Sequence, residues 1–225
     1  MAKLIDNKQK IIECNPDEQE IEITELHSLV WMQLIREKKY PLVGCIIDRL
    51  NFSEEKKCRV ITRNDIVSSR DNPHECIIKA LIWAFPNDIQ KNRIERVLKN
   101  LPAIVGITGN YIEKNLSEEK FLNLYGQLYQ ISGVKDRIIS VIFYALGISC
   151  NGKKAVAITQ HVINAFEFYE EIKPFRIVNY RNREQDMGYL PRLFALNIEA
   201  LKIGVDVEQL EYFLFKEGKN NQTIY

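Results

Sequence analysis

The sequence has few features of membrane, secreted or exported proteins. No window approaches the roughly 18 uninterrupted apolar residues that a membrane-spanning helix needs. Residues 1–20, MAKLIDNKQKIIECNPDEQE, lack the apolar middle of a signal peptide. We therefore expect a cytoplasmic location and no contact with a membrane.

Cysteine and histidine are scarce and scattered. The five cysteines are odd in number and never form a CxxC pair, which argues against a disulfide framework and a zinc knuckle. The three histidines lie far apart, without the spacing of metal ligands, and no glycine-rich phosphate loop is present. We predict no metal and no cofactor, and we expect buried thiols at Cys14, Cys45, Cys58, Cys76 and Cys150.

An excess of basic charge is also missing. Lysine and arginine total 31 against 30 acidic residues, which gives a formal net charge of +1. Dedicated nucleic-acid binders usually carry a clear basic excess. Tight non-specific DNA binding is therefore not expected.

Helical periodicity, in contrast, is frequent, and 46% hydrophobic content over 225 residues is ample for a buried core. The pattern predicts a mainly α protein with an N-terminal extension over residues 1–60 and a helical core over 61–225. A short strand or an extended connection is expected at 56–62, and a loop at 149–154. The expected helices cover residues 24–39, 41–50, 74–85, 88–101, 118–131, 135–148, 189–204 and 206–218. Residues 155–172 are expected to form an entry segment followed by a further helix.

Local end signals support several of these helices. Thr24, Ser117, Thr159 and Asp206 are of the residue types that cap helix N-termini, whereas Gly204 and Gly218 stand where helices are expected to stop. The helix after Ser117 and the helix after Lys135 are separated by a tight Ser-Gly-Val break. The two helices are therefore predicted to form an αα-hairpin.

Three segments in this order resemble the core of the helix-hairpin-helix DNA glycosylases, and most closely the small bacterial relatives of 8-oxoguanine DNA glycosylase. The resemblance extends over roughly residues 60–218. It implies a helix-hairpin-helix glycosylase-like fold whose hairpin presents backbone N–H groups to a DNA phosphate. The segments are PHECIIKALIWAFPNDIQKNRIERVL, LYQISGVKDRIISVIFYALGI and AVAITQHVINAF.

The family's hairpin turn reads glycine-hydrophobic-glycine. The corresponding residues in this sequence are Ser132, Gly133, Val134 and Lys135, so that Lys135 replaces the second glycine. The resemblance implies contact with phosphate here. In related proteins such a turn can also hold a monovalent cation, which Lys135 makes doubtful in this chain.

Both catalytic positions of the family are altered. Arg137 stands in the slot of the catalytic lysine, and arginine cannot serve as an amine nucleophile because it stays protonated. Thr159 stands in the aspartate slot and carries no charge to stabilise an oxocarbenium-like transition state. A one-residue shift would offer Lys135 or Asp136 instead, although such residues at a helix start are more often solvated or capping. Schiff-base lyase chemistry is therefore not expected.

Several side chains could contact a base, and each also has a purely structural interpretation. Trp83 and Phe85 could stack on a purine or pack in the core. Thr159, Gln160 and His161 could meet a polar base edge, or serve as a helix cap followed by a core histidine. Tyr189 belongs to a group of C-terminal aromatics near which the related fold builds its base pocket. The mixed-charge run at 181–186 could contact phosphate or a protein, but is typical of a solvated loop.

The leading hypothesis is a catalytically degenerate, glycosylase-like protein that recognises a guanine-like or deazaguanine-like nucleobase, free or on modified nucleic acid. Relatives in the resembled group occur beside bacterial antiphage operons, including those with cyclic-oligonucleotide synthases, which implies a role in defence. One alternative is an active monofunctional DNA N-glycosylase that uses Asp136 or Glu75 to activate water. Another is a structural subunit that docks a partner protein of the same operon; an exposed apolar patch and a closed pocket would favour it.

Overall fold

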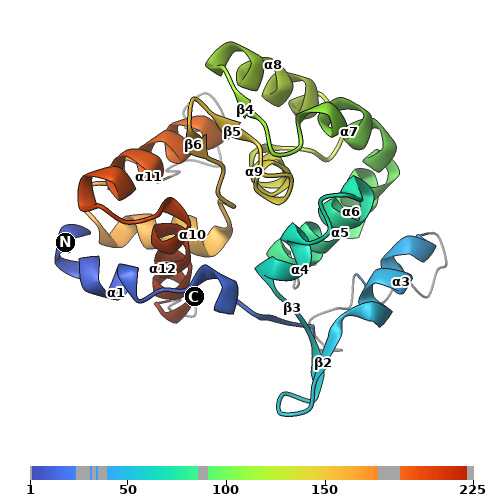
Figure 1. The fold of residues 1–225 in the computed structure, drawn as a ribbon, viewed down its shortest axis with the longest axis horizontal. Helices are drawn as coiled ribbons and strands as arrows, with labels where there is room; N and C mark the ends of the chain where they lie inside the picture. Colours follow the sequence, from blue (N-terminus) through green and yellow to red (C-terminus); the bar gives the residue numbers. More distant parts are fainter. Residues whose placement is uncertain are drawn as a thin grey trace. The chain divides into compact units, whose positions relative to one another are not determined.

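The computed structural model describes residues 2–23, 31, 34, 40–85, 91–176 and 188–221 (Figure 1). The chain is mainly helical, as predicted, with small sheets. Within the described ranges, no helix is long and apolar enough to cross a membrane. The chain divides into two compact units, one made of Met1–Pro16 with Gly152–Tyr225 and the other of Asp17–Asn151. This division does not coincide with the predicted boundary at residue 60.

The second unit contains the predicted αα-hairpin and two of the three segments on which the resemblance rests. Its three-stranded antiparallel sheet has the order β1-β3-β2, and a short parallel pair joins β4 to β5. Its elements are β1 (Ile21–Ile23), α3 (Pro41–Arg49), β2 (Asn51–Ser53), β3 (Cys58–Ile61), α4 (Arg63–Val67), α5 (Pro73–Ala84), α6 (Lys91–Lys99), α7 (Leu101–Thr108), a 3-10 turn (Gly109–Tyr111), β4 (Asn115–Leu116), α8 (Glu118–Tyr129), α9 (Asp136–Ala145) and β5 (Ser149–Cys150).

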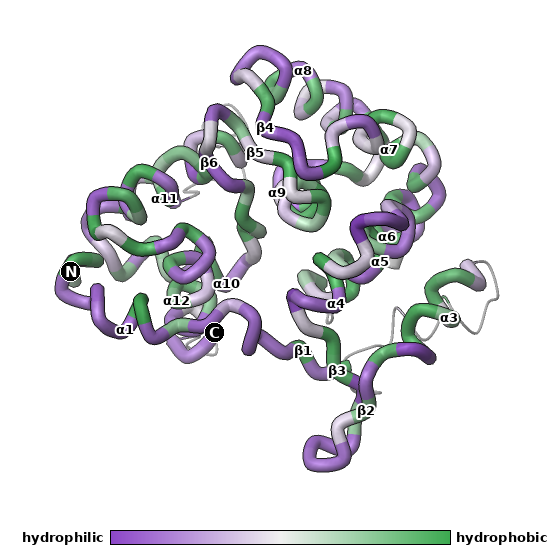
Figure 2. The backbone as a smooth tube through the Cα atoms, in the orientation of Figure 1, coloured by the Kyte–Doolittle hydropathy of each residue, from purple (hydrophilic) through white to green (hydrophobic). Residues whose placement is uncertain are grey.

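Helices α5 and α9 form the centre of the second unit. Every residue from Ile138 to Ala145 is buried, so α9 is surrounded on all sides, and the tube is green there in Figure 2. On α5, Ile77 and Leu81 are fully buried and the helix packs against α9. A helix that is apolar all round has to lie inside a core, and this fixes the position of the hairpin that α9 completes.

The first unit joins the start of the chain to its last third. The N–H of Ala2 donates to the Phe168 carbonyl (3.1 Å), and Gln209 Nε2 donates to the Ile12 carbonyl (3.1 Å). The elements are α1 (Lys8–Ile12), β6 (Lys153–Lys154), α10 (Gln160–Ala165), α11 (Tyr189–Ile203), α12 (Val207–Asn220) and short 3-10 turns at Ile5–Asn7, Phe166–Phe168 and Lys173–Phe175.

Of the end signals predicted for α11 and α12, two are confirmed and one is wrong. Asp206 caps α12 in a reciprocal capping box with Gln209, and Gly204 ends α11 with φ +75°. Gly218 does not end α12, because the helix continues to Asn220. It lies where the backbone of α10 approaches, and only glycine leaves room for that contact.

Other predictions need smaller corrections. The entry segment and the Thr159 cap predicted within 155–172 are present, but the helix after them is shorter than expected, because α10 ends at Ala165 and is followed by the 3-10 turn Phe166–Phe168. The loop expected at 149–154 contains the two-residue strands β5 and β6. Cys45 is exposed, whereas the other four cysteines are buried as expected. Trp31 and Leu34 are helical and buried, but the rest of the helix predicted at 24–39 and the loop at 181–186 lie outside the described residues.

Candidate functional site

The α8–α9 hairpin forms as the sequence predicts. Ser117 Oγ caps α8 by accepting from the N–H of Lys120 (3.5 Å), and α8 ends at Tyr129. Gly133 has φ +89°, a conformation that L side chains rarely adopt. Val134 is fully buried, and its N–H donates to the Ile131 carbonyl (3.0 Å). The hydrogen bond and the burial of Val134 therefore stabilise the turn, and a glycine stands at the position with the positive φ.

The residues that begin α9 are engaged with the end of α8. Lys135 Nζ donates to the Tyr129 carbonyl (2.9 Å) and lies 3.9 Å from the centroid of the Tyr129 ring. The carboxylate of Asp136 accepts a hydrogen bond from the Tyr125 hydroxyl. A cation near a helix C-terminus and a carboxylate in a first helical turn are both electrostatically favourable. These contacts give Lys135 and Asp136 a structural task in holding the hairpin closed.

Helix α6 packs directly on the hairpin turn. A β-carbon on Gly133 would come within 2.9 Å of Arg96 Cβ, so the two backbones approach more closely than any other residue would allow. Asn100 Nδ2 donates to the Ser132 carbonyl (3.2 Å) and also to the Arg96 carbonyl (2.8 Å). The basic side chains of α6 and the exposed hairpin turn therefore lie on one connected surface.

A pocket of about 480 Å³ opens beside α6 in the same unit. The pocket was not predicted from the sequence. The signal that could have pointed to it is the recurrence of Arg93, Arg96 and Lys99 at intervals of three along α6, a spacing typical of a basic helical face. Within the described part of the chain, neither Arg96 nor Lys99 forms an ion pair, and both are exposed. The pocket is lined by Tyr40, Asn92, Glu95, Arg96 and Lys99.

The two slots of the resembled catalytic pair belong to different units. Arg137 is half-buried in the first turn of α9 in the second unit. Thr159 belongs to the first unit, where it is 4% exposed and its hydroxyl accepts from the N–H of Val162 (3.5 Å). The predicted capping role of Thr159 is thus confirmed.

Trp83 and Phe85 lie in the core of the second unit. Trp83 is 2% exposed and stacks on Tyr144 with a centroid distance of 5.9 Å. The guanidinium of Arg63 lies 5.1 Å from the ring centroids of both Trp83 and Tyr144. The Phe85 carbonyl accepts a hydrogen bond from Trp31 Nε1 (3.1 Å). Trp83 and Phe85 are thus both buried in the core, and the buried arginine beside Trp83 and Tyr144 could not be foreseen from the sequence.

Arg63 is itself 1% exposed and donates from Nε and Nη2 to Gln19 Oε1, at 2.8 and 2.6 Å. The Gln19 amide nitrogen and the Trp83 indole nitrogen are buried without a hydrogen-bond partner in the described structure. A buried donor without a partner lowers the stability of the fold. Two such donors lie in this cluster, beside the buried guanidinium of Arg63.

The remaining predicted base contacts lie in the first unit. His161 is half-buried and packs edge-on against Phe215, with centroids 5.0 Å apart. Burial lowers the pKa of His161 below its ordinary 6.5 and the charge of Lys219 adds to this, whereas a backbone hydrogen bond with Gly218 opposes it. Gln160 Nε2 donates to Asn164 Oδ1 (2.9 Å), and Tyr189, 1% exposed, donates to the Val156 carbonyl (3.5 Å). Of these three, Gln160 and His161 retain partial exposure.

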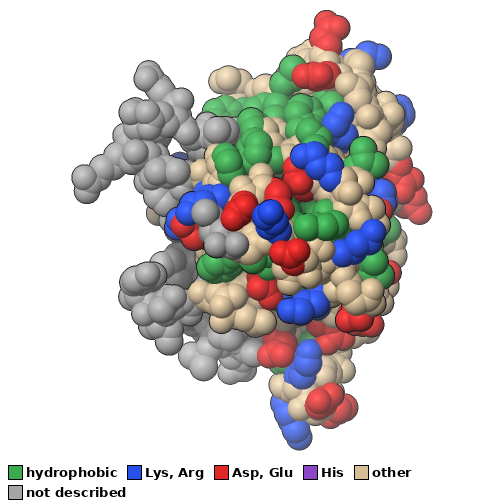
Figure 3. Space-filling model, turned by 90° about the vertical axis from the view of Figure 1, so that its left-hand side faces the viewer, with side chains coloured by type: hydrophobic (Ala, Val, Ile, Leu, Met, Phe, Trp, Pro, Cys, Tyr) green, Lys and Arg blue, Asp and Glu red, His purple; other side chains and the backbone are tan. Residues whose placement is uncertain are grey.

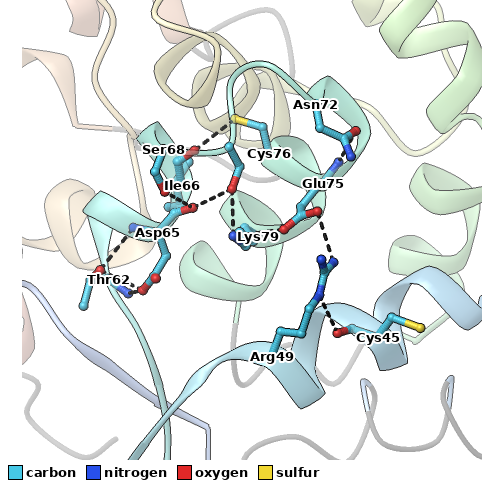
Figure 4. A network of polar contacts seen from close by, with 11 residues as sticks. Cys45, Arg49, Thr62, Asp65, Ile66, Ser68, Asn72, Glu75, Cys76 and Lys79 are labelled. Carbon is cyan, nitrogen blue, oxygen red and sulfur yellow. Dashed lines mark hydrogen bonds and ion pairs between the residues drawn. The ribbon is translucent and has the colours of Figure 1, made fainter.

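Glu75, considered above as an alternative acid, belongs to a polar network on α5 (Figure 4). Its carboxylate receives Arg49 Nη2 and Lys79 Nζ, each at 3.1 Å. Burial alone would raise the pKa of Glu75, but the hydrogen bonds and charges of Lys79 and Arg49 outweigh it and hold the pKa below its ordinary value. A carboxylate whose pKa is lowered by two cations is a weaker base toward water, which argues against the water-activating role considered for Glu75.

The thiol of the neighbouring Cys76 is expected to be unreactive. Its thiol contacts the Ile66 and Ala145 carbonyls, each at 3.4 Å, and burial raises the pKa of Cys76 to about 12. A thiol that stays protonated is a poor nucleophile.

Among the described residues, no three His, Cys, Asp or Glu side chains gather as a group that could hold a metal ion. In comparisons with protein-family models, curated proteins and solved structures, nothing matches this chain.

Proposed function

We propose that this protein is a catalytically degenerate relative of the helix-hairpin-helix DNA glycosylases. It binds nucleic acid through the α8–α9 hairpin and recognises a guanine-like or deazaguanine-like nucleobase within bacterial antiphage defence. The observation that carries the proposal is the turn between the two helices, with Gly133 in a left-handed conformation and α6 packed against it. The base and the defence context rest on the resemblance of the sequence.

The hairpin supports phosphate binding through two kinds of donor. Lys135 precedes α9 without capping it through its side chain, and a helix N-terminus favours an anion through its dipole. The exposed side chains of Arg96 and Lys99 on α6 add positive charge beside the turn. A local cluster of this kind can contact a phosphate although the whole chain is nearly neutral.

Loss of catalysis is supported by the two altered slots. Arg137 cannot supply an amine nucleophile at neutral pH, and the Thr159 hydroxyl is engaged in capping α10. Lys135 and Asp136, which a shifted alignment would offer, are held by Tyr129 and Tyr125. Base recognition without base release follows, with the partly exposed Gln160 and His161 as the proposed contacts to a polar base edge.

The proposal is tested by incubating the purified protein with guanine, 8-oxoguanine and a deazaguanine, and with DNA that carries each base, while thermal shift and base release are measured together. Stabilisation without release is expected. Release that is lost in Arg137→Ala or Thr159→Ala would instead establish an active glycosylase.

A partner-docking subunit is the second candidate, and an exposed apolar stripe favours it. Hydrophobic side chains gather on the face drawn in Figure 3. On α11, Ile198 is 44% exposed and Leu201 81%, and Phe194 lies one turn before Ile198 on the same helix face. If the protein neither gains thermal stability with any of these bases nor releases one, the docking role replaces base recognition.

A further inference from the structure

The pocket beside α6 has features that the proposed phosphate contact of the α8–α9 hairpin does not need. Its volume of about 480 Å³ lies within the range of small-ligand sites, and its wall combines an aromatic ring, an amide, two cations and the acidic side chain of Glu95. Tyr40, which precedes α3, is fixed in the wall because its hydroxyl donates to the Glu95 carbonyl (3.3 Å). The ring is therefore positioned by a contact with α6 itself.

The two cations in this pocket outnumber its one acidic side chain, Glu95, and neither cation forms an ion pair with a described residue. Arg96 Nε donates to the Asn92 carbonyl (3.0 Å), which orients the guanidinium, while its terminal nitrogens have no partner among the described residues. Lys99, one turn later, likewise has no ion pair with a described residue. Two cations one turn apart on the same helix, with the guanidinium of Arg96 oriented by its carbonyl contact, favour an oxyanion with several acceptor atoms, and a phosphate has this chemistry.

The pocket is also continuous with the hairpin turn. Asn100, the residue directly after Lys99 in sequence, binds the Ser132 carbonyl, and Arg96 Cβ sits against Gly133. A nucleic-acid strand that contacts the turn with one phosphate therefore meets Arg96 and Lys99 along the same surface. A duplex would keep its bases stacked and paired, whereas a single strand can lower a base into a pocket and place it on an aromatic ring.

We propose that this pocket binds one nucleotide of a single-stranded nucleic acid. The phosphate lies between Arg96 and Lys99, the base lies against Tyr40, and the Asn92 amide faces the polar edge of the base. This inference rests on the proposed nucleic-acid-binding function and adds to it the strandedness of the ligand and a site away from the resembled catalytic slots.

The test measures binding of a short fluorescent single-stranded oligonucleotide by anisotropy over a range of salt concentrations. The double variant Arg96→Gln/Lys99→Gln should reduce the slope of log K against log salt by about 0.7, the contribution of one phosphate on a single strand. The matched control Lys114→Gln/Lys120→Gln removes the same charge from exposed positions in the same unit and should leave the slope unchanged. Tyr40→Leu should weaken binding about tenfold at constant slope, and Tyr40→Phe should restore it.

The outcomes separate this inference from the function on which it rests. If the wild-type protein binds no oligonucleotide, the proposed function fails together with the pocket assignment. If the wild type binds but Arg96→Gln/Lys99→Gln behaves like its control, the pocket assignment is wrong and the hairpin proposal stands. Free GMP serves as a parallel ligand, and equal affinity for GMP and oligonucleotide, lost in the same variants, would overturn the single-strand part of the inference.

Discussion

The carbonyl oxygen of His161 occupies the space that a side chain on Gly218 would need. The contact joins the start of α10 to the last turn of α12, and it explains why a glycine is found inside a helix where that residue type is otherwise unfavourable. Between these two residues, backbone meets backbone without an intervening side chain. An added side chain at Gly218 would collide with the main chain of His161, which cannot move aside by rotating as a side chain can.

Gly218→Ala should therefore lower the free energy of unfolding by about 1–3 kcal/mol, the usual cost of overpacking. Urea denaturation followed by circular dichroism measures it. The control is Gly126→Ala, because Gly126 lies inside α8 with nothing within 4 Å of an added β-carbon. There the same change should stabilise the protein by about 0.5–1 kcal/mol, since alanine has the higher helix propensity. Equal effects at both glycines would refute the close approach of α10 and α12.

Gly133→Ala tests the packing of α6 on the hairpin turn. Gly133 and Gly152 share a left-handed conformation, with φ +89° and +76°, but an added β-carbon meets Arg96 Cβ at 2.9 Å only at Gly133. Gly152→Ala should cost about 1–2 kcal/mol of unfolding free energy from backbone strain alone. Gly133→Ala should cost more, by about 1–3 kcal/mol, because of the added clash. Chemical denaturation of the two variants in parallel measures the difference, and its absence would contradict the described turn.

Arg70 should contribute to stability well beyond an ordinary surface arginine. It donates from Nε to the Ala145 carbonyl (2.8 Å) and from Nη2 to the Tyr144 carbonyl (3.3 Å), so it covers carbonyls at the end of α9. Arg70→Met should lower the free energy of unfolding by about 2–3 kcal/mol.

The comparison is Arg49→Met, measured in the same denaturation assay. Arg49 is 59% exposed and pairs with Glu75, and an exposed ion pair contributes about 0–1 kcal/mol. A result in which Arg49→Met is as harmful as Arg70→Met would argue against a special role for the carbonyl contacts of Arg70.

His161 should make the first unit less stable in mild acid. Burial lowers its pKa in the folded state below the ordinary 6.5, so between these two values the unfolded chain binds a proton that the folded chain does not. Stability should fall as the pH decreases through this window and level off below the folded pKa. Thermal unfolding between about pH 8 and about pH 5 measures the trend, which His161→Gln should reduce. An unchanged profile in His161→Gln would assign the trend to other groups.

The hairpin could be predicted because its signals are local. Ser117 caps a helix, Gly133 breaks the chain, and the apolar spacing resumes at Ile138, all within one short stretch. The same holds for Asp206 and Gly204 around the last two helices. Such signals depend on neighbours in sequence, and those neighbours remain neighbours in the fold.

The features that were missed depend on contacts between distant parts of the sequence. Arg63 appears in sequence as one more charged residue, and only packing with Gln19 and Tyr144 makes it a buried cation. The α6 pocket needs Tyr40, more than fifty positions before Arg96, to complete its wall. Gly218 was misread for the same reason, since a glycine at a close approach and a glycine at a helix end look alike in sequence.

The composition of the two units also has a consequence for how the chain is made. The second unit is one uninterrupted stretch, Asp17–Asn151, so all of it has been synthesised before the last third is translated. The first unit is closed by Met1–Pro16 together with Gly152–Tyr225, and its opening segment must wait through most of synthesis before α12 exists to receive it. We therefore expect the hairpin-bearing unit to fold first, and Met1–Pro16 to dock only after α12 has been synthesised.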